Sequence, residues 1–186
     1  MPSTVSIYKF FIRKKLRQKT AGLPPALQRR KSRIIARKLL QIPGFIRARN
    51  VLIYVSKSGE VETWDLIRRA LRMKKTVWVP RMNPAKNEIE AVRISDFRKD
   101  LVPGAYGILE PRKPAKKTSA EKMDLMIIPG LGFDPSGKRI GRGLGYFDRF
   151  LQKTRGCKIG LAFQEQLLQR VPVEAHDIGV DSVITD

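Results

Sequence analysis

Four short apolar runs, separated by segments of other periodicities, constrain the fold of this chain more than any other feature. The runs are NVLIYVS from Asn50, KTVWVP from Lys75, DLMIIPG from Asp124 and KIGLAF from Lys158. Each has the length of a buried strand and lacks the polar alternation of a half-exposed one. Strands that alternate with helices favour an α/β domain with a largely parallel sheet.

Helical periodicity occupies the segments around these runs. Helices are expected at four places: residues 5–19, a segment that starts at Pro24 and Pro25, residues 63–73 and residues 146–154. A last strand is expected at residues 180–185. We therefore predict that residues 1–186 form a single three-layer α/β domain, with a largely parallel central sheet flanked by helices and two helices at the N-terminus.

The middle of the chain has weaker signals. Residues 81–87 are typical of a turn region, and residues 89–94 alternate like an edge strand. Residues 104–111 are turn-rich, and residues 112–122 are polar and basic, which is typical of a mobile loop.

The charge is unevenly distributed. The formal net charge is +21, and the first 50 residues hold fourteen basic residues and no acid. Such a surplus suits nucleic acid, an anionic small molecule or a targeting peptide. The apolar residues Ile7, Phe10, Phe11 and Leu16 among these charges, and the scarcity of serine, favour a helix of the folded domain over a transit peptide.

Other features exclude some classes of protein. One cysteine excludes a disulfide framework and a cysteine-cluster metal site, and fits a cytoplasmic protein. One histidine excludes multi-histidine metal chemistry. No apolar run is long enough to span a bilayer, so no membrane partner is expected.

A glycine-rich stretch between the third apolar run and the helix predicted from Tyr146 is the strongest candidate for function. It contains Gly130, Gly132, Gly137, Gly141, Gly143 and Gly145. Glycines allow backbone N–H groups to converge on one anion, and Lys138, Arg139 and Arg142 add positive charge. We interpret the stretch as a phosphate-binding loop, although it matches neither GxxxxGK[ST] nor GxGxxG. A β-hairpin or a hinge is the alternative.

Asp148 falls in the first turn of the helix predicted to follow this loop. Its carboxylate could cap the helix by accepting hydrogen bonds from free N–H groups. It could equally bind Mg²⁺, which prefers one or two carboxylates together with phosphate oxygens. The residues alone support both interpretations equally.

The segment MIIPGLGFDPSGKRIGRGLGYFDRFL, which starts at Met126, resembles the signature block of the 5-formyltetrahydrofolate cyclo-ligase family. Shorter matches follow the family's order along nearly the whole chain: RKKLR from Arg13, YVSKSGEVET from Tyr54, GILEP from Gly107, GLAFQEQ from Gly160 and HDIGVDSVIT from His176. The resemblance implies an ATP- and Mg²⁺-dependent ring closure. It would convert 5-formyltetrahydrofolate into 5,10-methenyltetrahydrofolate through an N5-iminium phosphate, with release of ADP and phosphate.

The resemblance also implies roles for individual residues. The positions that match the family's ATP contacts are Arg13, Arg17, Arg139, Ile140, Gly141, Arg142, Gly143, Leu144, Gly145, Tyr146 and Phe147. Those that match folate contacts are Val55, Glu60, Arg142, Gly143, Leu144, Gly145 and Tyr146. Arg142 and Tyr146 are the implied catalytic residues, and Asp148 and Asp181 the implied Mg²⁺ ligands.

The chain departs from the family pattern at two positions. Many members have glycine or lysine where this chain has Leu144, so Arg142 or Lys138 would have to supply the charge of such a lysine. Phe147 replaces a common second tyrosine, which removes a hydroxyl group and keeps a stacking surface.

Two other classes of function are the alternatives. A nucleic-acid-binding protein would explain the charge, but the chain has no RNP motif, no suitable KH-type GXXG and no convincing helix-turn-helix. A related α/β enzyme could use the same phosphate loop on another substrate. We expect a cytoplasmic monomer that acts on 5-formyltetrahydrofolate, with or without a polyglutamate tail, and has no nucleic-acid partner.

Overall fold

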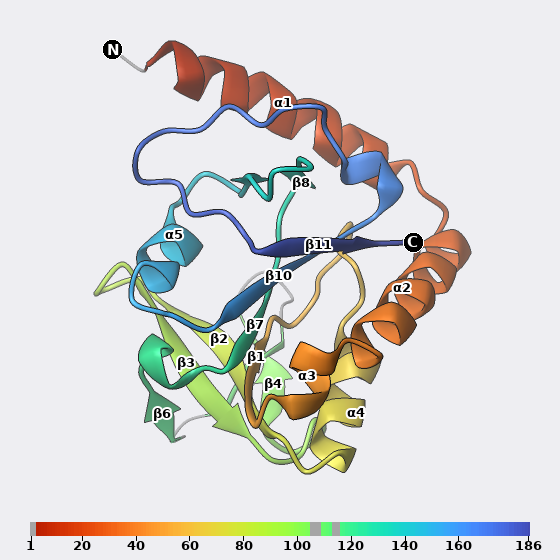
Figure 1. The fold of residues 1–186 in the computed structure, drawn as a ribbon, viewed down its shortest axis with the longest axis vertical. Coiled ribbons are helices and arrows are strands. Elements are labelled where there is room, and N and C mark those ends of the chain that lie inside the picture. Colours follow the sequence, from red (N-terminus) through yellow and green to blue (C-terminus); the bar gives the residue numbers. More distant parts are fainter. Residues whose placement is uncertain (1–2, 105–108, 113–115) are drawn as a thin grey trace.

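A seven-stranded sheet organises the computed structural model, which describes residues 3–104, 109–112 and 116–186 (Figure 1). The strands, in spatial order, are β11 (Ser182–Thr185), β10 (Cys157–Ala162), β7 (Leu125–Ile128), β1 (Asn50–Ile53), β2 (Thr76–Asn83), β3 (Glu88–Ile94) and β6 (Lys117–Thr118). The first five are mutually parallel, and β3 and β6 are antiparallel to their neighbours. The predicted α/β class with a largely parallel sheet is confirmed.

Helices cover both faces of the sheet. The helices are α1 (Thr4–Ala21), α2 (Pro25–Leu40), α3 (Pro43–Arg47), α4 (Trp64–Arg72) and α5 (Tyr146–Leu151). On one face, buried residues of α2, α3 and α4 such as Leu39, Phe45 and Ile67 pack against alternate strand residues. On the other face, Phe150 of α5 packs against Met126 and neighbouring strand residues. The chain thus forms three layers (Figure 1).

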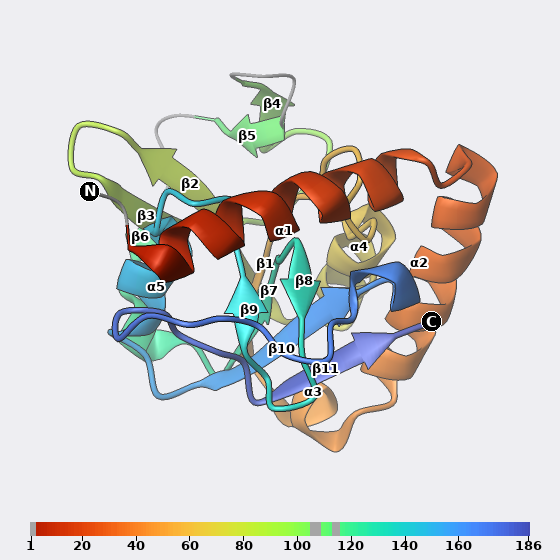
Figure 2. The ribbon, with the colours of Figure 1, turned by 90° about the horizontal axis from the view of Figure 1, so that it is seen from above.

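The helix α1 lies across the glycine-rich segment instead of on the sheet. That segment contains a small antiparallel hairpin of β8 (Gly132–Phe133) and β9 (Arg139–Ile140). Figure 2 shows α1 passing over both strands, and Leu16 of α1 packs there with Leu131, Ile140 and Val171. A hydrogen bond from the Ser6 N–H group to the Ser3 side chain caps the start of α1.

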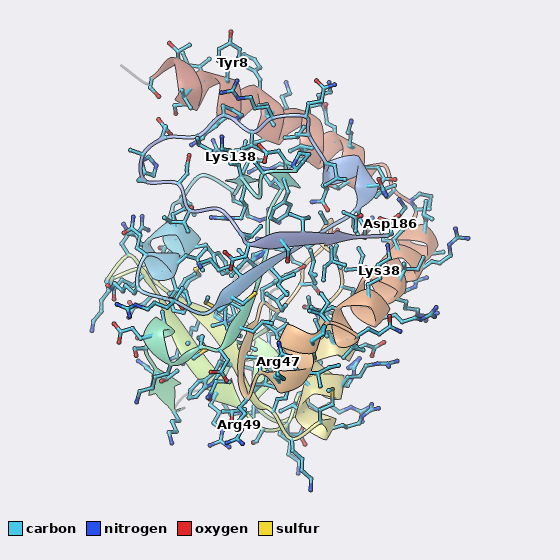
Figure 3. All side chains as sticks on the ribbon, in the orientation of Figure 1. Tyr8, Lys38, Arg47, Arg49, Lys138 and Asp186 are labelled. Carbon is cyan, nitrogen blue, oxygen red and sulfur yellow. The ribbon has the colours of Figure 1, made fainter. Side chains whose placement is uncertain are left out.

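The C-terminal strand is tied to α2 at its last residues. The Lys38 ammonium donates to the Thr185 carbonyl over 2.7 Å, and that of Lys31 lies 2.9 Å from an Asp186 carboxylate oxygen. Figure 3 shows the end of β11 beside α2, with Lys38 and Asp186 near each other. Among the residues the structure describes, no helix is both long and apolar enough to cross a membrane.

Several local expectations were wrong. Residues 81–83 continue β2 instead of turning, because β2 and β3 pair in a regular hairpin up to Asn83 and Glu88. The strand β3 is not an edge strand, since β6 pairs with it at two positions. The expected turn-rich and mobile segments fall partly on residues 105–108 and 113–115, which lie outside the described residues. Flanking them, the chain forms β4 (Leu101–Pro103) and β5 (Leu109–Pro111).

Candidate active site

The glycine-rich segment follows β7, a central strand, so it starts at the carboxyl end of the parallel part of the sheet. Ligands of α/β proteins bind at this edge. The first half of the segment is the β8–β9 hairpin, and the second half, residues 141–145, leads directly into α5. From the sequence, we weighed a phosphate-binding loop against a β-hairpin. The structure has a hairpin in the first half of the segment and a glycine loop in the second half.

The hairpin turn is held rigidly. The Asp134 carboxylate accepts from the Ser136 hydroxyl over 2.7 Å and from the backbone N–H groups of Ser136, Lys138 and Val171 over 2.8–3.1 Å. Burial alone would raise the pKa of this acid, but the bond from the Ser136 hydroxyl and those from the backbone lower it. Gly137 has φ +78°, and a Cβ there would overlap the Val180 carbonyl oxygen. The turn thereby fixes β9, which carries Arg139 toward the second half of the segment.

A buried ion pair joins β9 to α5. The Arg139 guanidinium donates to Asp148 Oδ1 over 2.6 Å, and the two side chains are 3% and 15% exposed. The same oxygen accepts from the Ile178 backbone N–H over 3.1 Å. In the described part of the chain, Asp148 therefore bonds to a neighbouring arginine and a distant loop, instead of capping the first N–H groups of α5.

Arg13 of α1 lies against the backbone of the glycine loop. Its Nε donates to the Gly141 carbonyl over 2.9 Å, and a Cβ placed on Gly143 would lie 3.4 Å from its Cζ. Gly143 has φ +106°, a conformation that favours glycine. Partial burial lowers the pKa of Arg13, while nearby Asp177 opposes that shift. The helix thus places a guanidinium directly on the loop.

A second ion pair joins the loop to the segment after β1. Arg142 Nη2 donates to Glu60 Oε1 over 2.7 Å, and Glu60 Oε2 accepts from the Lys57 backbone N–H over 3.2 Å. The Glu60 side chain is 9% exposed and that of Arg142 is 39% exposed. Burial, with Arg142 close by, lowers the pKa of Lys57. The segment that follows β1 and the glycine loop therefore meet through the ion pair of Glu60 with Arg142, and their shared role in one site stays a prediction.

The charged residues of α1 and of the loop border one hollow of about 460 Å³. It is lined by Phe10, Arg13, Lys14, Arg17, Gln18 and Arg142. Four of these side chains are cationic and none is acidic. The hollow has the size of a small-molecule site, and its cations suit a polyphosphate. The structure thus brings Arg13, Arg17 and Arg142 together, although 125 residues separate the last two in sequence.

Comparisons with known proteins identify the family of this chain. Residues 6–186 match the model of the 5-formyltetrahydrofolate cyclo-ligase family. The chain belongs to this family. It is 31% identical to the mouse 5-formyltetrahydrofolate cyclo-ligase, with 97% of this chain and 95% of the mouse protein covered. It is 29% identical to the enzyme of that name from Escherichia coli K12, with 91% and 96% covered.

Solved structures show the fold of this family. The structure of Aquifex aeolicus 5,10-methenyltetrahydrofolate synthetase has a TM-score of 0.84 to this chain at 34% identity, and covers 95% of this chain and 88% of its own. The Mycoplasma pneumoniae synthetase has a TM-score of 0.77 at 20% identity, with 96% and 98% covered, and shares the fold. As a member of this family, the chain is an enzyme of the ligase class.

The remaining loop residues predicted for this family member have distinct environments. Leu144 is 71% exposed, and its carbonyl accepts from Arg149 Nη2 over 3.0 Å. The Tyr146 ring lies 5.2 Å from the Arg149 guanidinium, and the Phe147 ring 5.9 Å from that of Arg139. The Ile140 side chain is buried beneath α1, so its predicted contact with ATP would have to be made by its backbone.

Val55 lies buried just after β1, beside the segment that holds Glu60. The neighbouring Tyr54 hydroxyl donates to the Val61 carbonyl over 2.9 Å. Its burial, together with the charge of Glu60, raises the pKa of Tyr54. The buried residues Tyr54 and Val55 therefore form an apolar wall beside the candidate site, and Glu60 is the acidic residue next to that wall.

The two acids predicted to bind Mg²⁺ have different partners. Asp181, just before β11, accepts from the Lys158 backbone N–H over 2.7 Å at the amino end of β10. Asp148 bonds to Arg139 and to the Ile178 N–H. No cluster of three or more histidine, cysteine or acidic residues forms a metal site within residues 3–104, 109–112 and 116–186. The joint metal site stays a prediction.

Sequence reasoning missed two features of the site. Lys9 is 3% exposed, and its ammonium bonds to Glu174 over 2.9 Å and to Asp177, which fastens α1 to the loop before β11. A lysine on the same helix face as the buried Leu16 was the available signal. Phe10 lines the hollow, whereas in the sequence we used it only as an apolar residue that favours a helix.

Proposed function

We propose that this chain catalyses the ATP- and Mg²⁺-dependent cyclisation of 5-formyltetrahydrofolate to 5,10-methenyltetrahydrofolate, with release of ADP and phosphate. Its family membership supports the folate chemistry. The observation that supports the use of ATP is the hollow in which Arg13, Arg17 and Arg142 meet beside the glycine loop. Three guanidinium groups offer charge-assisted hydrogen bonds to a triphosphate, which lysines of an ordinary solvated surface do not provide at fixed positions.

The proposed reaction has two steps. The formyl oxygen attacks the γ-phosphorus of ATP, so that an O–P bond forms and the bond to ADP breaks, which leaves an N5-iminium phosphate. N10 then attacks the activated carbon, the C–O bond breaks, and phosphate leaves as N10 loses its proton. Phosphoryl transfer of this kind depends mainly on positioning and on neutralising charge.

Arg142 is the residue best placed to act in both steps. Its guanidinium is only partly exposed and is oriented by Glu60, so it borders the hollow in a defined direction. When the triphosphate binds, Arg142 donates to the transferred phosphoryl group and shares or leaves its contact with Glu60. The freed Glu60 oxygen then accepts from an N–H group of the pterin ring, beside Val55. Tyr146, at the end of the loop, closes the folate side of the site.

The residues near the loop also suit Mg²⁺, which would neutralise part of the triphosphate charge. Oδ1 of Asp148 already accepts two hydrogen bonds, so Oδ2 is the oxygen that would hold the cation. The ion pair with Arg139 fixes the direction of that carboxylate. Asp181 is the second predicted acid. Its contact with the Lys158 N–H holds it at the amino end of β10, whereas the glycine-rich segment follows the carboxyl end of the parallel β7, so the proposed cation site at the loop rests on Asp148.

The test is a direct assay. Purified protein is mixed with 5-formyltetrahydrofolate, ATP and Mg²⁺, and the near-ultraviolet absorbance of the methenyl product is followed. ATP-free and Mg²⁺-free mixtures are the controls. Growth of the signal only in the complete mixture supports the proposal. A protein that binds ATP without forming this product would be an enzyme that uses the same loop on another substrate.

A further inference from the structure

The hollow beside the glycine loop has an uneven lining. Five of its six residues are polar or cationic, and the sixth, Phe10, is aromatic and 61% exposed. A large aromatic side chain in contact with water contributes nothing to the hydrophobic core. Placed at the wall of a cationic hollow, its face is available to a flat ligand group.

We propose that Phe10 stacks on the base of the bound nucleotide and so completes the ATP site. This inference rests on the proposed use of ATP. Helix geometry sets the spacing: Arg13 follows Phe10 by about 4.5 Å along the α1 axis and Arg17 by about 10.5 Å. A nucleotide with its base on Phe10 therefore extends its triphosphate along α1 toward Arg13 and Arg142, at the glycine loop.

The contact between Arg13 and the loop fixes the direction of the nucleotide. Because Arg13 donates to the Gly141 carbonyl and lies on Gly143, the phosphate end belongs at the middle of α1. Phe10 is one turn closer to the N-terminus of that helix, at the end of the hollow away from Arg17. The base end and the phosphate end are thus both defined by residues of one helix.

The adjacent Phe11 provides a matched control within the same helix. Its exposed fraction is also 61%, and its ring meets that of Phe10 at a centroid distance of 5.6 Å and an angle of 79°. Successive helical residues point about 100° apart, and Phe11 does not line the hollow. Loss of Phe11 removes a similar exposed ring without touching the nucleotide.

Stacking recognises that a base is present and does not select its identity, because every base offers a π-face. We therefore expect Phe10 to strengthen the binding of ATP and GTP alike. Inorganic tripolyphosphate carries the same type of charge and no base, so Phe10 should not affect its binding. The ratio of ATP affinity to tripolyphosphate affinity isolates the contribution of the base.

The experiment measures dissociation constants of ATP and of tripolyphosphate by calorimetry for the full chain and for F10A, F10Y and F11A. We expect F10A to weaken ATP binding about 5- to 100-fold, with tripolyphosphate binding unchanged and F10Y close to the starting protein.

Equal weakening of the binding of both ligands by F10A, or equal ATP affinities for F10A and F11A, would overturn the role of Phe10. A starting protein that binds neither ligand would overturn the proposed ATP site itself, and with it this inference. ATP binding that depends on Phe10 in a protein without cyclo-ligase activity would refute only the proposed function.

Discussion

Arg142 and Glu60 are 82 residues apart in the sequence, yet their ion pair orients both side chains. Arg142 is the proposed phosphate ligand and Glu60 the proposed folate ligand, so their ion pair couples the two halves of the site. A residue that has one fixed partner before the substrates arrive loses less freedom when they bind. The pair therefore predicts coupled effects of mutation.

The first prediction concerns this coupling. R142A should lower kcat/KM for ATP about ten- to a hundredfold, because one charge-assisted phosphate contact is worth about 1.5–3 kcal/mol. E60Q should raise the KM for folate more than that for ATP. Because the two side chains contact each other, the double mutant should deviate from additivity by about 0.5–3 kcal/mol. Steady-state kinetics of the four proteins measure this, and strictly additive effects would show that the pair is incidental.

The second prediction concerns Asp148, whose carboxylate balances the buried charge of Arg139. Removing one partner of a buried ion pair costs about 3–5 kcal/mol, and asparagine keeps an oxygen acceptor, so D148N should lose about 3 kcal/mol of unfolding free energy. It should also raise the Mg²⁺ concentration that gives half-maximal activity. Urea unfolding and a Mg²⁺ titration measure these separately.

The matched control for D148N is D65N, which removes an exposed acid paired with Arg68 on α4. Exposed pairs contribute little, so its unfolding free energy should change by less than about 1 kcal/mol. If D148N had the stability of D65N and an unchanged Mg²⁺ dependence, Asp148 would be neither a structural partner nor a metal ligand.

At the level of elements, the two halves of the glycine-rich segment should respond differently to the same substitution. G137A places a methyl group against the Val180 carbonyl at φ +78°, so it should destabilise the fold by about 2–5 kcal/mol. G143A also has an unfavourable φ, but its methyl group would meet the movable Arg13 guanidinium at 3.4 Å. We therefore expect G143A to raise the KM for ATP and G137A to lower the melting temperature.

Kinetics and thermal melts on the two variants give the comparison. An unchanged KM for ATP in G143A would mean that Arg13 holds the loop without contributing to the nucleotide site. A KM raised in both variants by the same factor would mean that the hairpin and the loop act as one unit.

The sequence was sufficient for the elements whose signal is local. The strands β1, β2, β7 and β10 are continuous apolar runs, and α2 begins at the predicted proline, because burial on both faces and helix-start chemistry are visible in the residues. A β-hairpin was only the alternative interpretation of the segment that forms β8 and β9, because strands of two residues carry little signal of their own. The strand β6 was not recognised, since it also has two residues and depends on pairing with β3. The helix α3 is similarly short.

The residues of the candidate site also divide into those with a local sequence signal and those whose partners lie far away in the sequence. The glycines and arginines of the loop were recognised because their chemistry is unusual and their spacing matches a family. The ion pairs of Arg139 with Asp148 and of Arg142 with Glu60 depend on tertiary geometry that no spacing reveals. Lys9 was missed for that reason, because its acids are more than 160 residues away.

At the level of the whole molecule, the excess of basic over acidic residues is larger than the number of basic residues that line the hollow. The hollow contains four cations, whereas the net charge is +21. Other basic residues lie far from it: Figure 3 shows Arg47 and Arg49 at the end of the molecule opposite α1 and Tyr8. A field spread over the surface steers anionic substrates inward without defining a second site.

The last prediction tests whether this surplus is a general field or a specific nucleic-acid surface. A diffuse field gives sequence-independent binding to polynucleotides, with dissociation constants of about 10⁻⁴–10⁻⁶ M at physiological salt and a linear fall of log affinity with log salt. We expect duplexes of different sequence to bind equally and to dissociate as salt rises. The kcat/KM for ATP should also fall with salt, because steering is screened over about 10 Å at 0.1 M. Fluorescence anisotropy and kinetics over one salt series measure both. Tight, sequence-dependent binding that persists at physiological salt would instead assign the surplus to nucleic-acid recognition, beside the cyclo-ligase site.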